Sequence, residues 1–189
     1  FQEFTKKYSI SPLRDEARRT VGDLLFQTKN YADALKVYRG IPAEARNETV
    51  AGREVLSLFR LRRIKEAQKK TKAFKKDYRN APSWLALFDV EGGKSYLKAG
   101  NPKQARKVFN DVIKKYPGTE AMAEARFYLS QALYKEGRAE DYLVALATFI
   151  KNHPDNSNWS SAQLELAELY FKDEDYPNAS RAYQSLLAN

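Results

Sequence analysis

The chain has 189 residues and a formal net charge of +9, from 33 Lys and Arg against 24 Asp and Glu. It contains no Cys and a single His, His153, which excludes disulfide frameworks, thiol nucleophiles and metal sites built from several Cys or His ligands. Hydrophobic residues make up 43% of the chain, enough for a buried core, and no run of about 18 apolar residues predicts a transmembrane helix.

The sequence repeats itself at a fixed spacing. Three similar segments begin at Gly93, Ser130 and Ala167, each 37 residues after the one before, and fainter copies begin at Gly22 and Val55. We refer to these five first residues as the anchors. Apolar residues spaced i, i+3, i+4, i+7 lie on both sides of a turn in each copy, which predicts two helices per repeat.

In chain order, the pattern predicts a short entry segment followed by five helix pairs. Residues 1–12 are interpreted as the tail of a preceding repeat and its linker, so that the chain is a fragment of a longer protein. The repeats are expected at about 13–43, 44–81, 82–118, 119–155 and 156–189, with turns near 29–31, 61–64, 99–102, 136–140 and 173–176.

The turns also carry helix-start signals. Asn30 and Asn101 are predicted N-caps, Pro102 suits the first position of a helix, and Gln104 completes a variant of the capping box with Asn101.

Twelve residues after each anchor, a mostly small residue recurs, which allows two antiparallel helices to approach closely. This column holds Ala34, Ala67, Ala105, Tyr142 and Ala179. We expect Ala105 and Ala179 to be buried at helix crossings. Two departures stand out. Glu54 precedes the anchor Val55 in a normally apolar column, and Tyr142 replaces Ala, where we expect a locally wider or shifted helix pair.

This pattern resembles the tetratricopeptide repeat, whose motif is matched by Gly93, Tyr96, Ala105, Phe109 and Pro117. The resemblance implies an all-α fold, a right-handed α-solenoid of about five antiparallel helix pairs. The linker 116–120 is also similar to those of bacterial envelope repeat proteins of the TolA-binding and BamD type. That narrower likeness favours a location in the bacterial periplasm or at the outer-membrane periphery. The sequence itself shows no targeting segment from which a compartment could be predicted.

Candidate catalytic groups are few. No phosphate-binding Gly loop, nucleophile elbow or HExxH motif occurs. His153 precedes Pro154 at a helix end and is interpreted as a helix C-cap, and Asp173–Asp175 as a solvated turn. We therefore predict no enzymatic activity, no cofactor and no metal site.

The resemblance implies that the first helix of each pair lines a concave groove. Four and five residues after each anchor, aromatic residues stand beside cations, which suits a partner segment that alternates apolar and acidic groups. The alternative is that the aromatics pack between repeats and the cations are solvated. The predicted groove residues are Phe26, Phe59, Arg60, Lys98, Gln131, Tyr134, Lys135, Phe171 and Lys172.

The charge is concentrated between residues 60 and 79, where ten basic residues face two acidic ones. Lys is more frequent than Arg in this stretch. No aromatic residues alternate with the charged ones, whereas surfaces that stack nucleic-acid bases carry such aromatic residues. This stretch lies mainly on the second helix of its repeat, which the resemblance places on the outer face. Its candidate patch residues are Arg62, Arg63, Lys65, Lys69, Lys72 and Lys76.

Together these features predict a non-catalytic scaffold that binds a protein or peptide in the groove, with acidic partners suited to its cations. One alternative is a purely structural solenoid segment of a larger protein. The other is binding of an anionic partner or nucleic acid through the 60–79 stretch, which steep salt dependence would reveal. The partner and the oligomeric state are not predicted.

Overall fold

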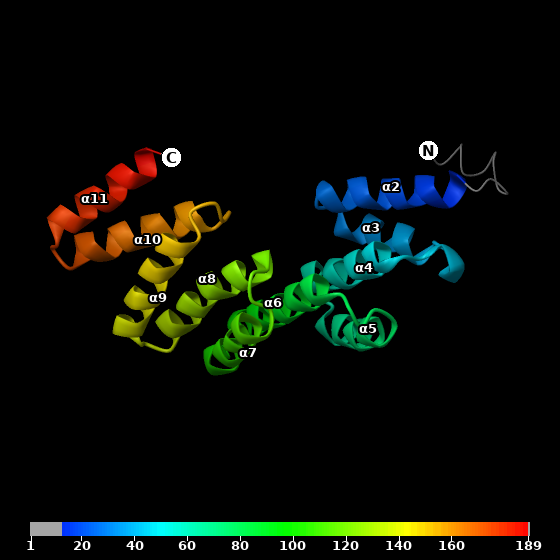
Figure 1. Cartoon of the computed structure of the whole chain (residues 1–189), viewed down its shortest axis with the longest axis horizontal. Coiled ribbons are helices and arrows are strands. Elements are labelled where there is room, and N and C mark those ends of the chain that lie inside the picture. The colour runs from blue at the N-terminus through cyan, green and yellow to red at the C-terminus, as the bar shows by residue number, and fades with distance from the viewer. Residues whose placement is uncertain (1–12, 189) are drawn as a thin grey trace. The chain divides into compact units, whose positions relative to one another are not determined.

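The computed structural model describes residues 13–188, and over these residues every regular element is helical (Figure 1). The all-α prediction is therefore confirmed, while the predicted entry segment 1–12 lies outside the described residues. The helices are α2 (Leu13–Gln27), α3 (Tyr31–Arg39), the 3-10 helix Ala43–Ala45, α4 (Glu48–Arg60), α5 (Ile64–Asp77), α6 (Pro82–Lys98), α7 (Pro102–Lys115), α8 (Glu120–Lys135), α9 (Ala139–Asn152), α10 (Trp159–Lys172) and α11 (Tyr176–Leu187).

The chain forms two compact units that divide inside α6, between Glu91 and Gly92. In the first unit, α2 packs on α3, α3 on α4, and α4 on α5. In the second unit, α7 packs on α8, α8 on α9, α9 on α10, and α10 on α11. Within each unit, helices that follow one another in sequence are thus neighbours in space, as the helix-pair pattern predicts.

A left-handed residue ends the first helix of every pair. It stands seven residues after each anchor, at Lys29, Arg62, Gly100, Gly137 and Glu174. This conformation turns the chain so that orphan carbonyls at the helix end are satisfied. In the first turn, for example, the Asn30 amide donates to the Leu25 carbonyl at 2.8 Å. The predicted turns are therefore confirmed, including the one that follows the degenerate anchor Val55.

The helix starts agree only partly with the predicted caps. The Asn30 side chain accepts a hydrogen bond from the Asp33 amide, as predicted. Asn101 occupies the N-cap position of α7, but its side chain makes no capping hydrogen bond, so its half of the predicted capping box is wrong. Pro102 begins the helix with φ preset, which explains how α7 starts without that bond.

The column twelve residues after the anchors is buried throughout. Ala105 and Ala179 are buried as predicted, and so are Ala34 and Ala67. Tyr142 occupies the same position and is also buried, with its hydroxyl donating to Glu165 at 2.8 Å. Burial and this hydrogen bond raise the pKa of Tyr142 above its usual range. The predicted widening of this helix pair stays a prediction.

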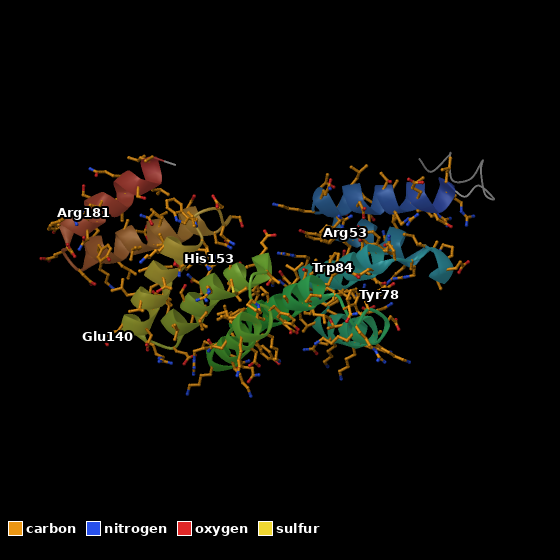
Figure 2. All side chains as sticks on the ribbon, viewed as in Figure 1. Arg53, Tyr78, Trp84, Glu140, His153 and Arg181 are labelled. Carbon is orange, nitrogen blue, oxygen red and sulfur yellow. The ribbon has the colours of Figure 1, made fainter. Side chains whose placement is uncertain are left out.

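The glycine anchors are positions of close helix contact. A Cβ atom on Gly22 would lie 2.5 Å from the Tyr38 ring, and one on Gly93 would overlap the Phe109 ring. In the second repeat, Gly52 on α4 makes a different close contact, because the aromatic ring it meets comes from the next helix pair and not from the paired helix. That ring belongs to Trp84 at the start of α6, beside α4 (Figure 2).

Glu54, the departure noted in the sequence, is buried on α4 with 1% of its surface exposed. Arg46 forms an ion pair with its carboxylate, the Lys70 amine lies 2.9 Å away, and the Arg39 guanidinium 3.6 Å away. These cations come from α3, α5 and the segment before α4. The carboxylate therefore ties together four consecutive parts of the first unit.

Candidate partner-binding surfaces

The predicted groove aromatics divide into a buried and an exposed group. Phe59 is 6% exposed and packs in the core of the first unit with Phe74 and Phe88. By contrast, Tyr134 is 61% exposed and Phe171 is 59% exposed. Residues at the same offset from their anchors therefore have different environments, and only the later repeats present an aromatic ring to solvent.

The three predicted groove residues of the first unit are engaged in internal contacts. The Phe26 ring lies edge-on to Tyr31 with 5.3 Å between ring centroids, and the Arg53 guanidinium lies 5.8 Å from the Phe26 ring centroid. The exposed Arg60 forms an ion pair of 2.9 Å with the buried Glu91. These contacts stabilise the fold, and they occupy much of the side-chain surface that Phe26, Phe59 and Arg60 could otherwise offer to a partner.

In the second unit, the predicted cations are exposed, and Lys135 and Lys172 each follow an exposed ring in the sequence. Lys98, Lys135 and Lys172 are all exposed at the ends of α6, α8 and α10, and no ion pair involves them within residues 13–188. The Tyr134 ring, next to Lys135 in sequence, lies 5.1 Å from the Tyr142 ring. The Tyr142 ring supports it from one side while its other side faces solvent.

Gln131 has a structural role rather than an open one. Its side-chain amide on α8 donates to Glu165 on α10 at 2.6 Å, and the same carboxylate oxygen accepts the Tyr142 hydroxyl hydrogen bond. The three side chains link α8, α9 and α10. This network holds the surface around Tyr134 in place, because it links α8, which carries Tyr134, and α9, which carries Tyr142, to α10.

The predicted basic patch forms a stripe on α5. Lys65, Lys69, Lys72 and Lys76 are exposed and follow one another at i, i+4, i+7 and i+11, which places them on one helix face. Arg62 is exposed in the preceding turn, and Arg63 pairs with Glu66. The other lysines of α5 are engaged elsewhere, since Lys70 meets Glu54 and Lys75 lies 3.7 Å from Asp89.

His153 is a structural residue, as its position before Pro154 predicts. It is the C-cap of α9, where its backbone amide donates to the Phe149 carbonyl and its ring lies 5.6 Å from the Phe149 ring. Burial, together with the charge of Arg126, lowers the pKa of His153.

Two kinds of site are not found in the part of the chain that the structure describes. Residues 13–188 contain no group of three or more His, Asp or Glu side chains placed to hold a metal ion. None of the helices in this range combines the length and hydropathy that a membrane span requires.

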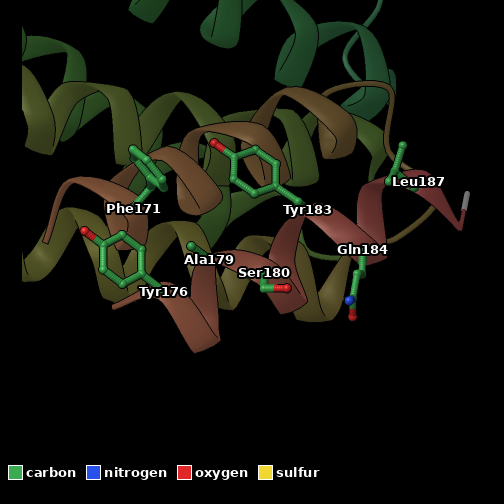
Figure 3. Close-up of a pocket in the computed structure, with 7 residues that line it drawn as sticks. All are labelled: Phe171, Tyr176, Ala179, Ser180, Tyr183, Gln184 and Leu187. Carbon is green, nitrogen blue, oxygen red and sulfur yellow. The ribbon is translucent and has the colours of Figure 1, made fainter. Parts of the chain in front are cut away.

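The sequence pattern did not single out an open apolar surface on the last helix pair. A hollow of about 340 Å³ lies along α11 beside the end of α10 (Figure 3). In the sequence, this surface is marked by apolar residues spaced along one face of α11. It was not recognised because the same spacing marks buried faces in the other repeats. The lining residues are Phe171, Tyr176, Ala179, Ser180, Tyr183, Gln184 and Leu187.

Comparisons with known proteins agree with this architecture. A tetratricopeptide repeat family model matches residues 1–48 and 90–157, which together make up more than half of the chain. No curated protein matches the sequence. The narrower resemblance to bacterial envelope proteins stays a prediction.

Solved structures of similar fold cover nearly the whole chain. MamA from Desulfovibrio magneticus RS-1 is 15% identical with a TM-score of 0.63, over 92% of this chain and 93% of that one. Repeats of a putative kinesin light chain from Podospora anserina are 13% identical with a TM-score of 0.59, over 95% and 96%. A Rap protein complexed with Competence and Sporulation Factor is 12% identical with a TM-score of 0.72, over 97% of this chain and 56% of that one. At these identities the likeness shows the fold alone.

Proposed function

The chain belongs to the tetratricopeptide repeat family, and on that premise we propose that it is a non-catalytic scaffold that binds an acidic and apolar protein segment. The binding surface of this proposal lies at the ends of the first helices of the second unit. It comprises Tyr134 with its sequence neighbour Lys135 and with Lys98, which stands at the same offset as Lys135 in the preceding repeat.

The exposure of Tyr134 is the observation that carries the proposal. Helix pairs precede and follow it in the second unit, and it is nevertheless 61% exposed. A ring that stays exposed gives up the stabilisation that its burial in the core would bring. Aromatic rings held by a rigid scaffold are frequent anchors in protein interfaces. The network of Gln131, Glu165 and Tyr142 holds the surrounding helices in place, so a partner would find the ring already oriented.

The cations determine which partner fits. Lys98 and Lys135 stand at the same offset in consecutive repeats, so they recur at equivalent places on α6 and α8. Exposed lysines without internal ion pairs attract an acidic chain over several ångströms and make its association dependent on salt. An acidic segment with interspersed apolar side chains matches both features.

We expect the double substitution Lys98→Glu with Lys135→Glu to weaken binding of such a segment by about tenfold or more, because two attractions become repulsions. The probe is a fluorescein-labelled synthetic peptide that alternates Glu with Leu and Phe, followed by fluorescence anisotropy at several salt concentrations. Tyr134→Ala should weaken binding with an unchanged salt dependence. The melting temperature should hold in all variants, since the altered side chains are exposed.

A matched control separates the surface from general charge. Lys103→Glu with Lys107→Glu changes two exposed lysines on α7 by the same amount. If that control weakens binding equally, or if Tyr134→Ala binds normally, the proposed surface is wrong. Absence of binding by any acidic or apolar peptide would favour the alternative of a purely structural repeat segment.

The lysine stripe on α5 supports a second candidate function, the binding of a polyanion such as nucleic acid. Four exposed lysines on one helix face offer positive charge without the aromatic rings that read bases. We expect replacement of Lys65, Lys69, Lys72 and Lys76 by Gln to reduce the salt dependence of binding to a labelled duplex DNA, with the slope falling by about 0.9 for each phosphate that is no longer neutralised. An unchanged slope would eliminate the stripe as a polyanion site.

A further inference from the structure

We propose that the surface around Tyr134 holds one arginine side chain of the bound segment, between the Tyr134 ring and the carboxylate of Glu165. This inference rests on the proposed function, because it names a residue of the segment that binds there. The rest of that segment stays acidic and apolar. The chain itself binds its own cations with the same pair of groups, an aromatic ring and a carboxylate.

Arg53 on α4 is the first example. Its guanidinium lies over the Phe26 ring, 5.8 Å from the ring centroid, and forms an ion pair with Asp23. Both partners belong to α2, the first helix of the preceding pair. A cation over an aromatic ring is attracted by the electrons of the ring, and the carboxylate adds charge-assisted hydrogen bonds.

Lys94 on α6 is a second example, in the other unit. Its amine lies 4.8 Å from the centroid of the Tyr128 ring and 3.0 Å from the carboxylate of Glu124, both on α8. Again the contact joins the first helices of two consecutive pairs. The chain therefore uses a ring and a carboxylate to hold a cation at this kind of contact in each of its units.

At Tyr134 the same offsets meet, but no cation of the chain is present. Tyr134 stands four residues after its anchor, as Phe26 does. Glu165 stands two residues before its anchor, as Arg53 does. Tyr142 connects the two, because its ring lies 5.1 Å from the Tyr134 ring and its hydroxyl donates to Glu165 at 2.8 Å. A carboxylate thus stands where the first unit has a guanidinium.

Glu165 is a partly buried carboxylate without a cation beside it. One of its oxygens accepts hydrogen bonds from Gln131 and Tyr142, and no ion pair involves Glu165 in the described part of the chain. By contrast, the partly buried carboxylates of Glu124 and Glu136 each pair with a cation. A partner's cation would supply the opposite charge that Glu165 lacks.

The electrostatics at the two rings also favour a cation. Burial, the hydrogen bond to Glu165 and the charges of Glu165 and Glu168 all raise the pKa of Tyr142. Both carboxylates therefore make this place negative. Arg suits it better than Lys, because a planar guanidinium stacks on a ring while its N–H groups bind a carboxylate.

Lys135 is the chain's own alternative occupant. It has the offset of Arg60, which pairs at 2.9 Å with Glu91, the residue at the offset of Glu165. Lys135 itself is exposed and forms no such pair in the described residues. We therefore expect Lys135→Gln and Glu165→Gln to change the urea unfolding midpoint additively. A combined loss smaller than the sum would mean that Lys135 already occupies the carboxylate, and would overturn the proposal.

Two labelled peptides that differ in one side chain test the site. Each is the peptide of Glu, Leu and Phe used for the proposed function, with its central Leu replaced by Arg in one and by citrulline, the neutral counterpart of Arg, in the other. We expect the Arg peptide to bind about tenfold more tightly in fluorescence anisotropy. General attraction to a basic chain would instead favour the citrulline peptide, because that peptide is the more acidic one.

Two substitutions locate the arginine. Glu165→Gln removes the charge but keeps an oxygen that can accept from Gln131 and Tyr142. The ratio of the two peptide affinities should then fall to about one. Tyr134→Leu removes the ring from an exposed position and should lower the ratio part of the way. The control Glu140→Gln removes an exposed charge from the first turn of α9 and should preserve the ratio.

The outcomes separate this inference from the proposed function. Equal binding of the two peptides, or a ratio that survives Glu165→Gln, overturns the arginine site while the scaffold function stands. A ratio that falls equally in Glu140→Gln also overturns it, because general charge would then explain the preference. If neither these peptides nor the all-acidic one binds, both proposals fail. Should thermal unfolding show that Glu165→Gln is destabilised, an unchanged ratio in Tyr134→Leu overturns the site instead.

Discussion

Replacing Glu54 with Gln is expected to lower the free energy of unfolding by about 3 kcal/mol, the lower end of the range for removing one partner from a buried ion pair. The substitution keeps the shape of the side chain and removes only its charge. Arg46, Lys70 and Arg39 would then surround a neutral group. The lower end applies because all three cations are partly exposed and can regain some hydration.

The same variant should change how stability depends on pH. Burial raises the pKa of Glu54, but the hydrogen bond from Lys70 and the charges of Arg46 and Lys70 outweigh burial, so the pKa lies below its usual value. A carboxylate with a lowered pKa in the folded state contributes its full stability above the pKa of the unfolded chain, about 4.3. That contribution is lost as the pH falls through the folded-state pKa. The difference between the original chain and Glu54→Gln should therefore shrink below about pH 4.

Urea unfolding followed by far-UV circular dichroism at pH 7 and at acidic pH measures both effects. Glu66→Gln is the matched control, because Glu66 also pairs with Arg39 but is accessible to solvent. Its loss of stability should be much smaller, as for surface ion pairs in general. Equal losses for Glu54→Gln and Glu66→Gln would show that burial of Glu54 contributes nothing beyond a surface pair.

The repeat register was predictable because it depends on local chemistry. A left-handed residue ends each first helix, and Ala stands at four of the five buried crossing positions, so residues such as Gly100, Gly137 and Ala105 recur at fixed spacings. Even the degenerate second repeat keeps this geometry, with Arg62 in the left-handed conformation that Gly100 and Gly137 adopt in later repeats and that Lys29 and Glu174 adopt in the first and last. Such constraints act within a few residues and are therefore visible in the sequence.

Contacts between consecutive helix pairs were not predictable in the same way. Phe59 and Tyr134 share an offset from their anchors, yet one is buried and the other exposed. The difference depends on which side chains the next pair brings against each of them. Likewise, nothing local indicates that Gly52 accepts the Trp84 ring or that three cations converge on Glu54. These pairings depend on side-chain size and direction in two different repeats, which a single column does not encode.

The anchor contact itself predicts the largest effect in the second unit. Phe109 is fully buried, with its ring against Gly93 on one helix and stacked on Tyr128 of another. We expect Phe109→Ala to cost about 3–5 kcal/mol, because apolar burial is removed and a cavity is left behind. Thermal and urea unfolding of the purified variant measure this loss.

Two adjacent glycines on α6 provide the internal test of this contact. Gly93→Ala forces a Cβ atom into the Phe109 ring and should cost about 1–3 kcal/mol. A Cβ atom on Gly92 would meet no described atom within 4 Å outside its own helix, so Gly92→Ala should stabilise by up to about 1 kcal/mol through helix propensity alone. The same chemical change at neighbouring positions is thus expected to have opposite signs.

The double variant Gly93→Ala with Phe109→Ala distinguishes direct contact from separate effects. Without the ring, the added methyl group has room and fills part of the cavity, so the combined loss should be smaller than the sum of the single losses by about 0.5–3 kcal/mol. Additive losses, or a Gly93→Ala variant as stable as Gly92→Ala, would contradict the contact. In that case the small residue at the anchor would not be explained by close approach of the paired helices.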